Sequence, residues 1–217
     1  MMLANAAHEA GTFRAARAEM EAALRHQKEW RPSGVFYGDQ SLGMTALLRS
    51  EKLATGEDVE QARKAYRSRF ATIFDSNPTL ALGAVACQGV ETEDEALLAV
   101  AHLPAAPNTG ELMQQFESGR ALIGIALHKA GDSQRAIPWL RDAAGSCRGW
   151  MWPRAFVDAH RHLGEALEST GDKDGACEAY GFVLRHWGRA KPRSITAELV
   201  RKRATALGCP SPRDPAR

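Results

Sequence analysis

Small and apolar residues recur along the chain at one fixed set of offsets, with the spacing of helices. Three segments share this pattern, and they begin at Leu3-Ala4, Ile123-Gly124 and Leu163-Gly164. Counted from the second residue of each pair, small or apolar residues follow at offsets of three, seven, twelve, sixteen and nineteen. No sustained alternation with a period of two, the mark of a strand, accompanies it. Each segment is therefore predicted to form a helix, a tight turn and a second helix.

Two weaker copies of the pattern lie between these segments, at Leu42-Gly43 and Leu82-Gly83. The small residues at positions 4, 43, 83, 124 and 164 then recur about every forty residues. Small residues let two helices approach closely, while larger apolar ones fill the space between them. The sequence thus predicts an all-α chain, built as a right-handed superhelical solenoid of about five helix–turn–helix repeats.

Residues typical of helix ends support this division. Four glycines, each followed by an acidic or hydroxyl residue, are predicted to end first helices: Gly11, Gly56, Gly131 and Gly171. Thr92 and Glu95 have the spacing of a capping box. Pro138 falls in the first turns of a predicted second helix, where it has no N–H to donate.

The C-terminal part of the chain departs from the repeat. Ser194 is predicted to cap a final helix that runs to about Leu207 and covers the apolar end of the solenoid. The helical domain would span residues 1–209, and the tail 210–217, with three prolines, is expected to be disordered. The first unit fits the pattern only if Met1 lies inside its first helix, which would then lack its opening turn. Either the chain is cut from a longer protein, as we expect, or this helix is frayed.

The pattern of small residue, Leu, Gly, Ala and aromatic residue in Gly124–Ala143 and Gly164–Val183 resembles the tetratricopeptide repeat. From about Gly119 to Cys209, the chain is similar to the repeat region that follows the kinase domain in serine/threonine kinases of myxobacterial type. It departs from the family in its longer period and in Val183, where alanine is usual. No kinase motif occurs, so the resemblance implies a regulatory or scaffolding part.

The resemblance also implies which residues line the inner, groove-forming face. They fall on one helical stripe in each unit. In the fourth unit the stripe holds Ser118, Ala121, Ile125 and His128, and in the fifth it holds Asp158, Arg161, Glu165 and Glu168. The groove would be acidic at one unit and partly apolar at the next. The alternative is a solvated polar face without a dedicated ligand.

Trp150 and Trp152 lie in the connection between the fourth and fifth units. Exposed aromatic residues are strong anchors in protein interfaces, so both are candidate partner-binding residues. Alternatively, they fill the extra space that a longer repeat leaves.

Four cysteines without a C-x-x-C pair exclude a dense disulfide scaffold and a typical zinc ribbon. Cys177 starts the second helix of the fifth unit, and Cys209 follows the final helix. If these two helices run antiparallel, their ends meet and a disulfide becomes sterically possible. Two buried thiols are an equal alternative, and Cys87 and Cys147 have no evident partner.

No metal site is expected from the histidines. His160 and His162 are two apart on a predicted helix and point to different faces, and the His8-Glu9 pair lacks the second histidine of an H-E-x-x-H motif. A basic run from Arg185 to Arg203 is diluted only by Glu198, and such clusters on terminal helices are usually solvated.

Composition narrows the functional classes. A formal charge of +2 on 217 residues gives no global field that would favour nucleic acid or a membrane surface. No apolar stretch approaches the roughly 20 residues of a membrane span, and no phosphate loop, nucleophile elbow or dinucleotide fingerprint occurs.

The expectation is a soluble, non-catalytic protein–protein interaction module without a cofactor. It would be cytoplasmic, or extracytoplasmic if tethered to a membrane kinase. The alternative is a small-molecule sensor with an apolar pocket near Ile125.

Overall fold

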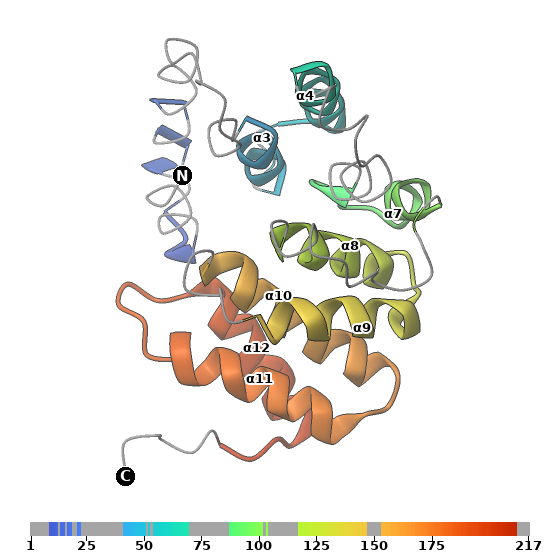
Figure 1. Ribbon diagram of the computed structural model, residues 1–217. Coiled ribbons are helices and arrows are strands. Elements are labelled where there is room, and N and C mark those ends of the chain that lie inside the picture. Colours follow the sequence, from blue (N-terminus) through green and yellow to red (C-terminus); the bar gives the residue numbers. More distant parts are fainter. Residues whose placement is uncertain are drawn as a thin grey trace.

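The protein is all-helical over the residues that its computed structural model describes, and no strand occurs among them. The described residues are 9–12, 14–15, 17–18, 21–22, 41–50, 52, 54–69, 87–101, 103, 117–146 and 153–211. The helices in chain order are α3 (Ser41–Ser50), α4 (Gly56–Arg69), α7 (Glu93–Val100), α8 (Glu117–Lys129), α9 (Ser133–Ala144), α10 (Pro153–Ser169), α11 (Lys173–Trp187) and α12 (Ile195–Leu207) (Figure 1). The prediction of an all-α chain is confirmed.

From α7 to α12, each helix packs against the next one along the chain. In addition, α10 packs against α8, so that the first helices of two neighbouring hairpins lie side by side (Figure 1). One apolar core runs through this part, and its largest fully buried side chains are Trp139, Tyr180, Ile123, Leu127, Leu140, Val183 and Val200.

The two C-terminal hairpins close around glycines that the repeat pattern singled out. A Cβ atom on Gly124 would lie 2.7 Å from Cγ of Leu140, and one on Gly164 would lie 2.3 Å from Cε1 of Tyr180. Real Cβ atoms do not approach other atoms so closely. The small residue and the bulky residue sixteen positions later are therefore partners in one close helix–helix contact.

The turn after each first helix matches the sequence expectation in these hairpins. Gly131 and Gly171 adopt positive φ angles of 80° and 84°, a conformation that glycine reaches without strain. The next residue, Asp132 or Asp172, caps the second helix, and its carboxylate accepts a hydrogen bond from the backbone N–H three positions later.

The predictions for the other helix ends have mixed outcomes. Thr92 and Glu95 form the predicted capping box of α7. By contrast, the prediction that Gly56 ends a helix is wrong, because Gly56 is the first residue of α4. The positive φ angle of this turn, 59°, belongs to Lys52. The start of α4 is instead held by Thr55, whose hydroxyl accepts a hydrogen bond from the backbone N–H of Asp58.

Three cations hold the turn at residues 88–90, inside the third predicted unit. Arg63 donates a hydrogen bond to the carbonyl of Gln88, and Arg49 donates to that of Gly89. Lys129 of α8 donates to the carbonyl of Val90, at 2.6 Å. Because these donors come from α4, α3 and α8, the turn joins the hairpin of α3 and α4 to α8.

The final helix matches the prediction at both ends. Ser194 caps α12, and the helix ends at Leu207 with Gly208 in the left-handed conformation. Val200 and Ala204 belong to the core that α12 closes. The opening residues of the first and third predicted units, and residues 212–217 of the predicted tail, lie outside the described part of the chain.

Candidate functional site

The predicted partner-binding residues of the fifth unit follow one stripe along α10. Asp158, Arg161 and Glu165 are three or four positions apart, and their side chains are 20%, 23% and 11% exposed. Residues at this spacing share one face of a helix. The face is therefore partly open to solvent, although each charged side chain already has neighbours.

Ion pairs run along this stripe. Nε of Arg161 lies 3.9 Å from Oδ1 of Asp158, and its Nη1 lies 3.8 Å from Oε1 of Glu165. Nε of Arg154 lies 3.4 Å from Oδ2 of Asp158, and its Nη1 lies 3.7 Å from Oε1 of Glu9. These are loose contacts at the outer limit of an ion pair, so a ligand of opposite charge could replace individual partners.

His128 of α8 meets α10 at Glu165. Nε2 of His128 lies 3.9 Å from Oε2 of Glu165, and Nδ1 of His162 lies 3.0 Å from the same oxygen. The two imidazole rings stand edge to face, with centroids 6.2 Å apart. Of the three residues, His162 alone was absent from the predicted face, because its position in the repeat falls outside the stripe.

Burial and neighbouring charge set the ionisation of this group. Burial lowers the pKa of His128 and, more strongly, that of His162, so both imidazoles are neutral at pH 7. Burial acts to raise the pKa of Glu165, but contact with His162 and the positive charges of Arg161 and Arg203 lower it overall. The cluster thus presents two neutral imidazoles and one carboxylate.

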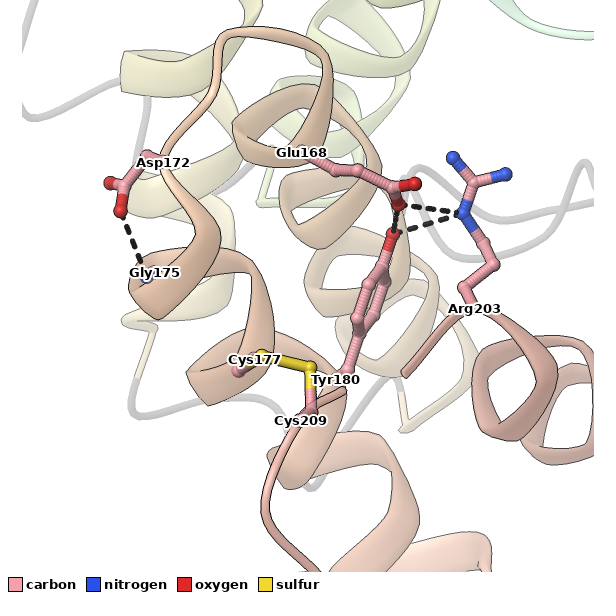
Figure 2. The surroundings of a disulfide bond; sticks show 7 residues. All are labelled: Glu168, Asp172, Gly175, Cys177, Tyr180, Arg203 and Cys209. Carbon is pink, nitrogen blue, oxygen red and sulfur yellow. Dashed lines mark hydrogen bonds and ion pairs between the residues drawn. A yellow bond between two sulfur atoms is a disulfide. The ribbon is translucent and has the colours of Figure 1, made fainter. Parts of the chain in front are cut away.

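Glu168, the last residue of the predicted stripe, takes part in the contact between α10, α11 and α12. The hydroxyl of Tyr180 donates a 2.6 Å hydrogen bond to Oε2 of Glu168, and Nε of Arg203 donates to both residues (Figure 2). Burial, together with the Glu168 carboxylate, raises the pKa of Tyr180, so the phenol stays protonated. Glu168 is therefore engaged in attaching the final helix.

The structure joins Cys177 and Cys209 by a disulfide, with their Cα atoms 5.3 Å apart (Figure 2). This bond and the Glu168–Tyr180–Arg203 contact both attach α12 to the last hairpin. Among the described residues, the buried thiol of Cys87 is free, and burial raises its pKa to about 12. Such a thiol is unreactive at neutral pH.

Two further groups of predicted residues have different outcomes. Ile125 is partly buried and packs against the core. Trp150 and Trp152 lie outside the described residues. Part of the basic run is paired within the chain, since Arg193 contacts Glu198 and Arg201 donates to the carbonyl of Gly188.

Comparison of the chain with protein-family models, curated proteins and solved structures gave no match. Among the described residues, no helix is both long enough and apolar enough to cross a membrane.

Proposed function

We propose that this protein is a non-catalytic interaction module that binds a charged segment of another protein on the face formed by α8 and α10. The observation that carries the proposal is that His128, from one hairpin, meets Glu165, from the next, and that Arg161 pairs with the same carboxylate on one partly exposed face. Side chains of both signs alternate there. A surface of this kind selects partners by charge pattern more than it adds affinity.

We further propose that the chain forms a right-handed solenoid of about five hairpins, with α12 as its capping helix. Consecutive packing from α7 to α12, and the contact of α10 with α8, support this arrangement. The resemblance of Gly119–Cys209 to repeat regions of bacterial serine/threonine kinases supports a regulatory or scaffolding role in signalling. Binding on the stripe would then bring a partner to such a kinase.

The experiment compares capture of partners by three forms of the purified chain. One is wild type, one carries Asp158→Asn and Arg161→Gln, and one carries Glu178→Gln as the control. Asp158 and Arg161 lie on the stripe, whereas Glu178 is an exposed residue of α11. Each change removes charge. Asp158→Asn and Glu178→Gln keep the shape of the side chain, and Arg161→Gln shortens a partly exposed one, so folding is expected to persist.

We expect wild type and Glu178→Gln to retain the same protein from the source lysate, and the double variant to lose it. Capture of the same protein by all three forms would contradict binding on this face. Native mass spectrometry of the purified chain gives the second readout, because a bound small molecule in place of a protein would favour the sensor alternative.

A further inference from the structure

Three side chains that commonly bind metal ions converge where α8 meets α10. His128 lies in the last turn of α8, and His162 and Glu165 lie one turn apart on α10. One potential ligand atom from each lies within 4.8 Å of the other two. Oε2 of Glu165 is 3.0 Å from Nδ1 of His162 and 3.9 Å from Nε2 of His128.

The second observation is the buried nitrogen of His162. The side chain is only 8% exposed, and its Nδ1 has no hydrogen-bond partner even though a carboxylate oxygen lies 3.0 Å away. A buried polar atom without a partner costs free energy, and native proteins rarely leave one without a reason. A metal ion between Nδ1 and the carboxylate would bind this nitrogen once the ring proton has moved to Nε2.

A third feature is an outer shell that orients His128. Its Nδ1 lies 2.9 Å from the hydroxyl oxygen of Ser133, which also accepts a hydrogen bond from Ser169. In the tautomer that donates from Nδ1 to Ser133, Nε2 carries the free lone pair on the side of Glu165. Metal-binding histidines are commonly fixed in this manner through their second nitrogen.

We propose that His128, His162 and Glu165 bind a divalent transition-metal ion, and that zinc fits best. Two imidazole nitrogens and one carboxylate oxygen are a set that zinc prefers. Metal–ligand distances of about 2.0–2.2 Å in a tetrahedron place neighbouring ligand atoms about 3.3–3.6 Å apart. The separations of 3.0 and 3.9 Å lie on either side of this range. The fourth position is left for water or for a side chain of a bound partner.

In the present arrangement, Arg161 competes with a metal ion for His162 and Glu165. It donates a hydrogen bond to Nε2 of His162 and lies 3.8 Å from Oε1 of Glu165. When Nδ1 binds a metal ion, the neutral ring carries its proton on Nε2, which can then no longer accept from Arg161. The guanidinium must move away, and Asp158, 3.9 Å from it, is its nearest alternative partner.

The metal ion would cross-link two neighbouring hairpins and change the charge of the face proposed for partner binding. This inference goes beyond the proposed function and does not depend on it, because the purified chain alone should bind the ion. A partner that binds without the metal, or a metal that binds without any partner, would separate the two proposals.

The test measures metal binding to the oxidised, chelator-treated chain. Isothermal titration with Zn²⁺ gives the affinity and the stoichiometry, and absorption with Co²⁺ reports the ligands. We expect one tight equivalent, visible bands of a low-symmetry Co²⁺ site and no thiolate charge-transfer band. A thiolate band at the first equivalent would assign the ion to a cysteine and overturn the proposal.

Variants decide which residues bind the ion. His128→Gln and Glu165→Gln should each weaken Zn²⁺ binding by at least about tenfold, since even outer-shell changes cost roughly 10–100-fold. His186→Gln, on an exposed histidine of α11, is the matched control and should bind as wild type does. Arg161→Gln should bind Zn²⁺ more tightly than wild type, because it removes the competing donor and its positive charge.

Circular dichroism first establishes that each variant is folded. If Glu165→Gln does not fold, His128→Gln decides the outcome, because His128 is partly exposed at the end of α8. The proposal is overturned if wild type binds Zn²⁺ no more tightly than His128→Gln, or if His186→Gln weakens binding equally. It is also overturned if Arg161→Gln weakens the binding of the ion.

Discussion

Oε2 of Glu9 lies 2.9 Å from the hydroxyl oxygen of Ser194, although 185 positions separate the two residues. The same carboxylate accepts hydrogen bonds from the backbone N–H and the hydroxyl of Thr196. Glu9 is nine-tenths buried and lies at the start of α12, where a negative charge is favourable. Glu9 thereby links the final helix to α10, where Nη1 of Arg154 lies 3.7 Å from its Oε1 (Figure 1 shows α10 and α12).

We expect Glu9→Gln to lower the free energy of unfolding by about 1–3 kcal/mol, because it removes the buried charge and replaces one of two acceptor oxygens by a donor. Urea denaturation measures the change. Glu21→Gln is the control, since its ion pair with Arg17 is exposed and should contribute no more than about 0.5 kcal/mol. Equal effects of the two substitutions would show that the contact of Glu9 with α12 adds nothing to stability.

Adding a methyl group at Gly164 tests the close approach of α10 and α11. The new Cβ would overlap the ring of Tyr180, so Gly164→Ala should destabilise the fold by about 1–3 kcal/mol. Gly181→Ala is the matched control within a helix. Its Cβ would meet only the flexible end of Arg185 at 3.4 Å, and it should stabilise the protein by up to about 1 kcal/mol. The midpoint of thermal unfolding measures both effects. A midpoint that shifts in the same direction in both variants would contradict the close contact of Gly164 with Tyr180.

Reduction of the Cys177–Cys209 bond should release the C-terminal end of α12. A disulfide between residues 32 positions apart contributes on the order of 2–4 kcal/mol. We therefore expect a reductant to lower the thermal midpoint of the wild type but to leave Cys209→Ser unchanged. Hydrogen exchange should show that the loss of protection is largest in α12. A midpoint that does not respond to the reductant would exclude a stabilising role for the bond.

The contact between Arg49 and Glu95 predicts a loss of stability in acid. The hydrogen bond from Arg49 holds the pKa of Glu95 at about 2, against an ordinary value of 4.5 that the unfolded chain retains. As the pH falls, the unfolded chain therefore takes up this proton first. The stability that the pair contributes is complete above about pH 4.5 and is lost as the pH falls towards 2.

Urea unfolding of the wild type and of Glu95→Gln between pH 6 and pH 2.5 measures this effect. The difference between them should be largest at pH 6 and should shrink in acid. Glutamine can still accept the hydrogen bonds of the capping box at Thr92, so the start of α7 is kept. A difference that does not change with pH would show that the charge of Glu95 is not coupled to folding.

Some of these relationships could be predicted from the sequence, because they depend on residues close together in it. Repeated small residues at 124 and 164, with bulky residues sixteen positions later, indicated both hairpins and their close contacts. The glycine and aspartate pairs at 131–132 and 171–172 predicted the turns, and Ser194 predicted the start of α12. The same reasoning wrongly placed Gly56 at the end of a helix. A glycine followed by acidic residues also fits the first turn of a helix, which is where Gly56 lies.

The candidate site could be predicted only in part. The resemblance to the tetratricopeptide repeat implied the stripe of Asp158, Arg161 and Glu165, and helical periodicity places these residues on one face. The sequence did not predict His162 as a metal ligand, because its only histidine neighbour in sequence, His160, points to a different face. In the structure its neighbour is His128, which comes from the preceding unit. Periodicity also could not show that Glu168 faces Tyr180 and Arg203 rather than a partner.

By itself, the sequence determined the helical class, the C-terminal hairpins and the bounds of the last helix. These features could be predicted because they depend on local periodicity and on the residues at helix ends. Such interactions act between residues that are close together in the sequence. Only the tertiary structure decided that Glu9 contacts the start of α12, that Lys129 binds the turn at Val90, and that His128 meets Glu165. Such contacts depend on the angles and offsets at which whole hairpins pack, and these arise from the sum of many side-chain volumes.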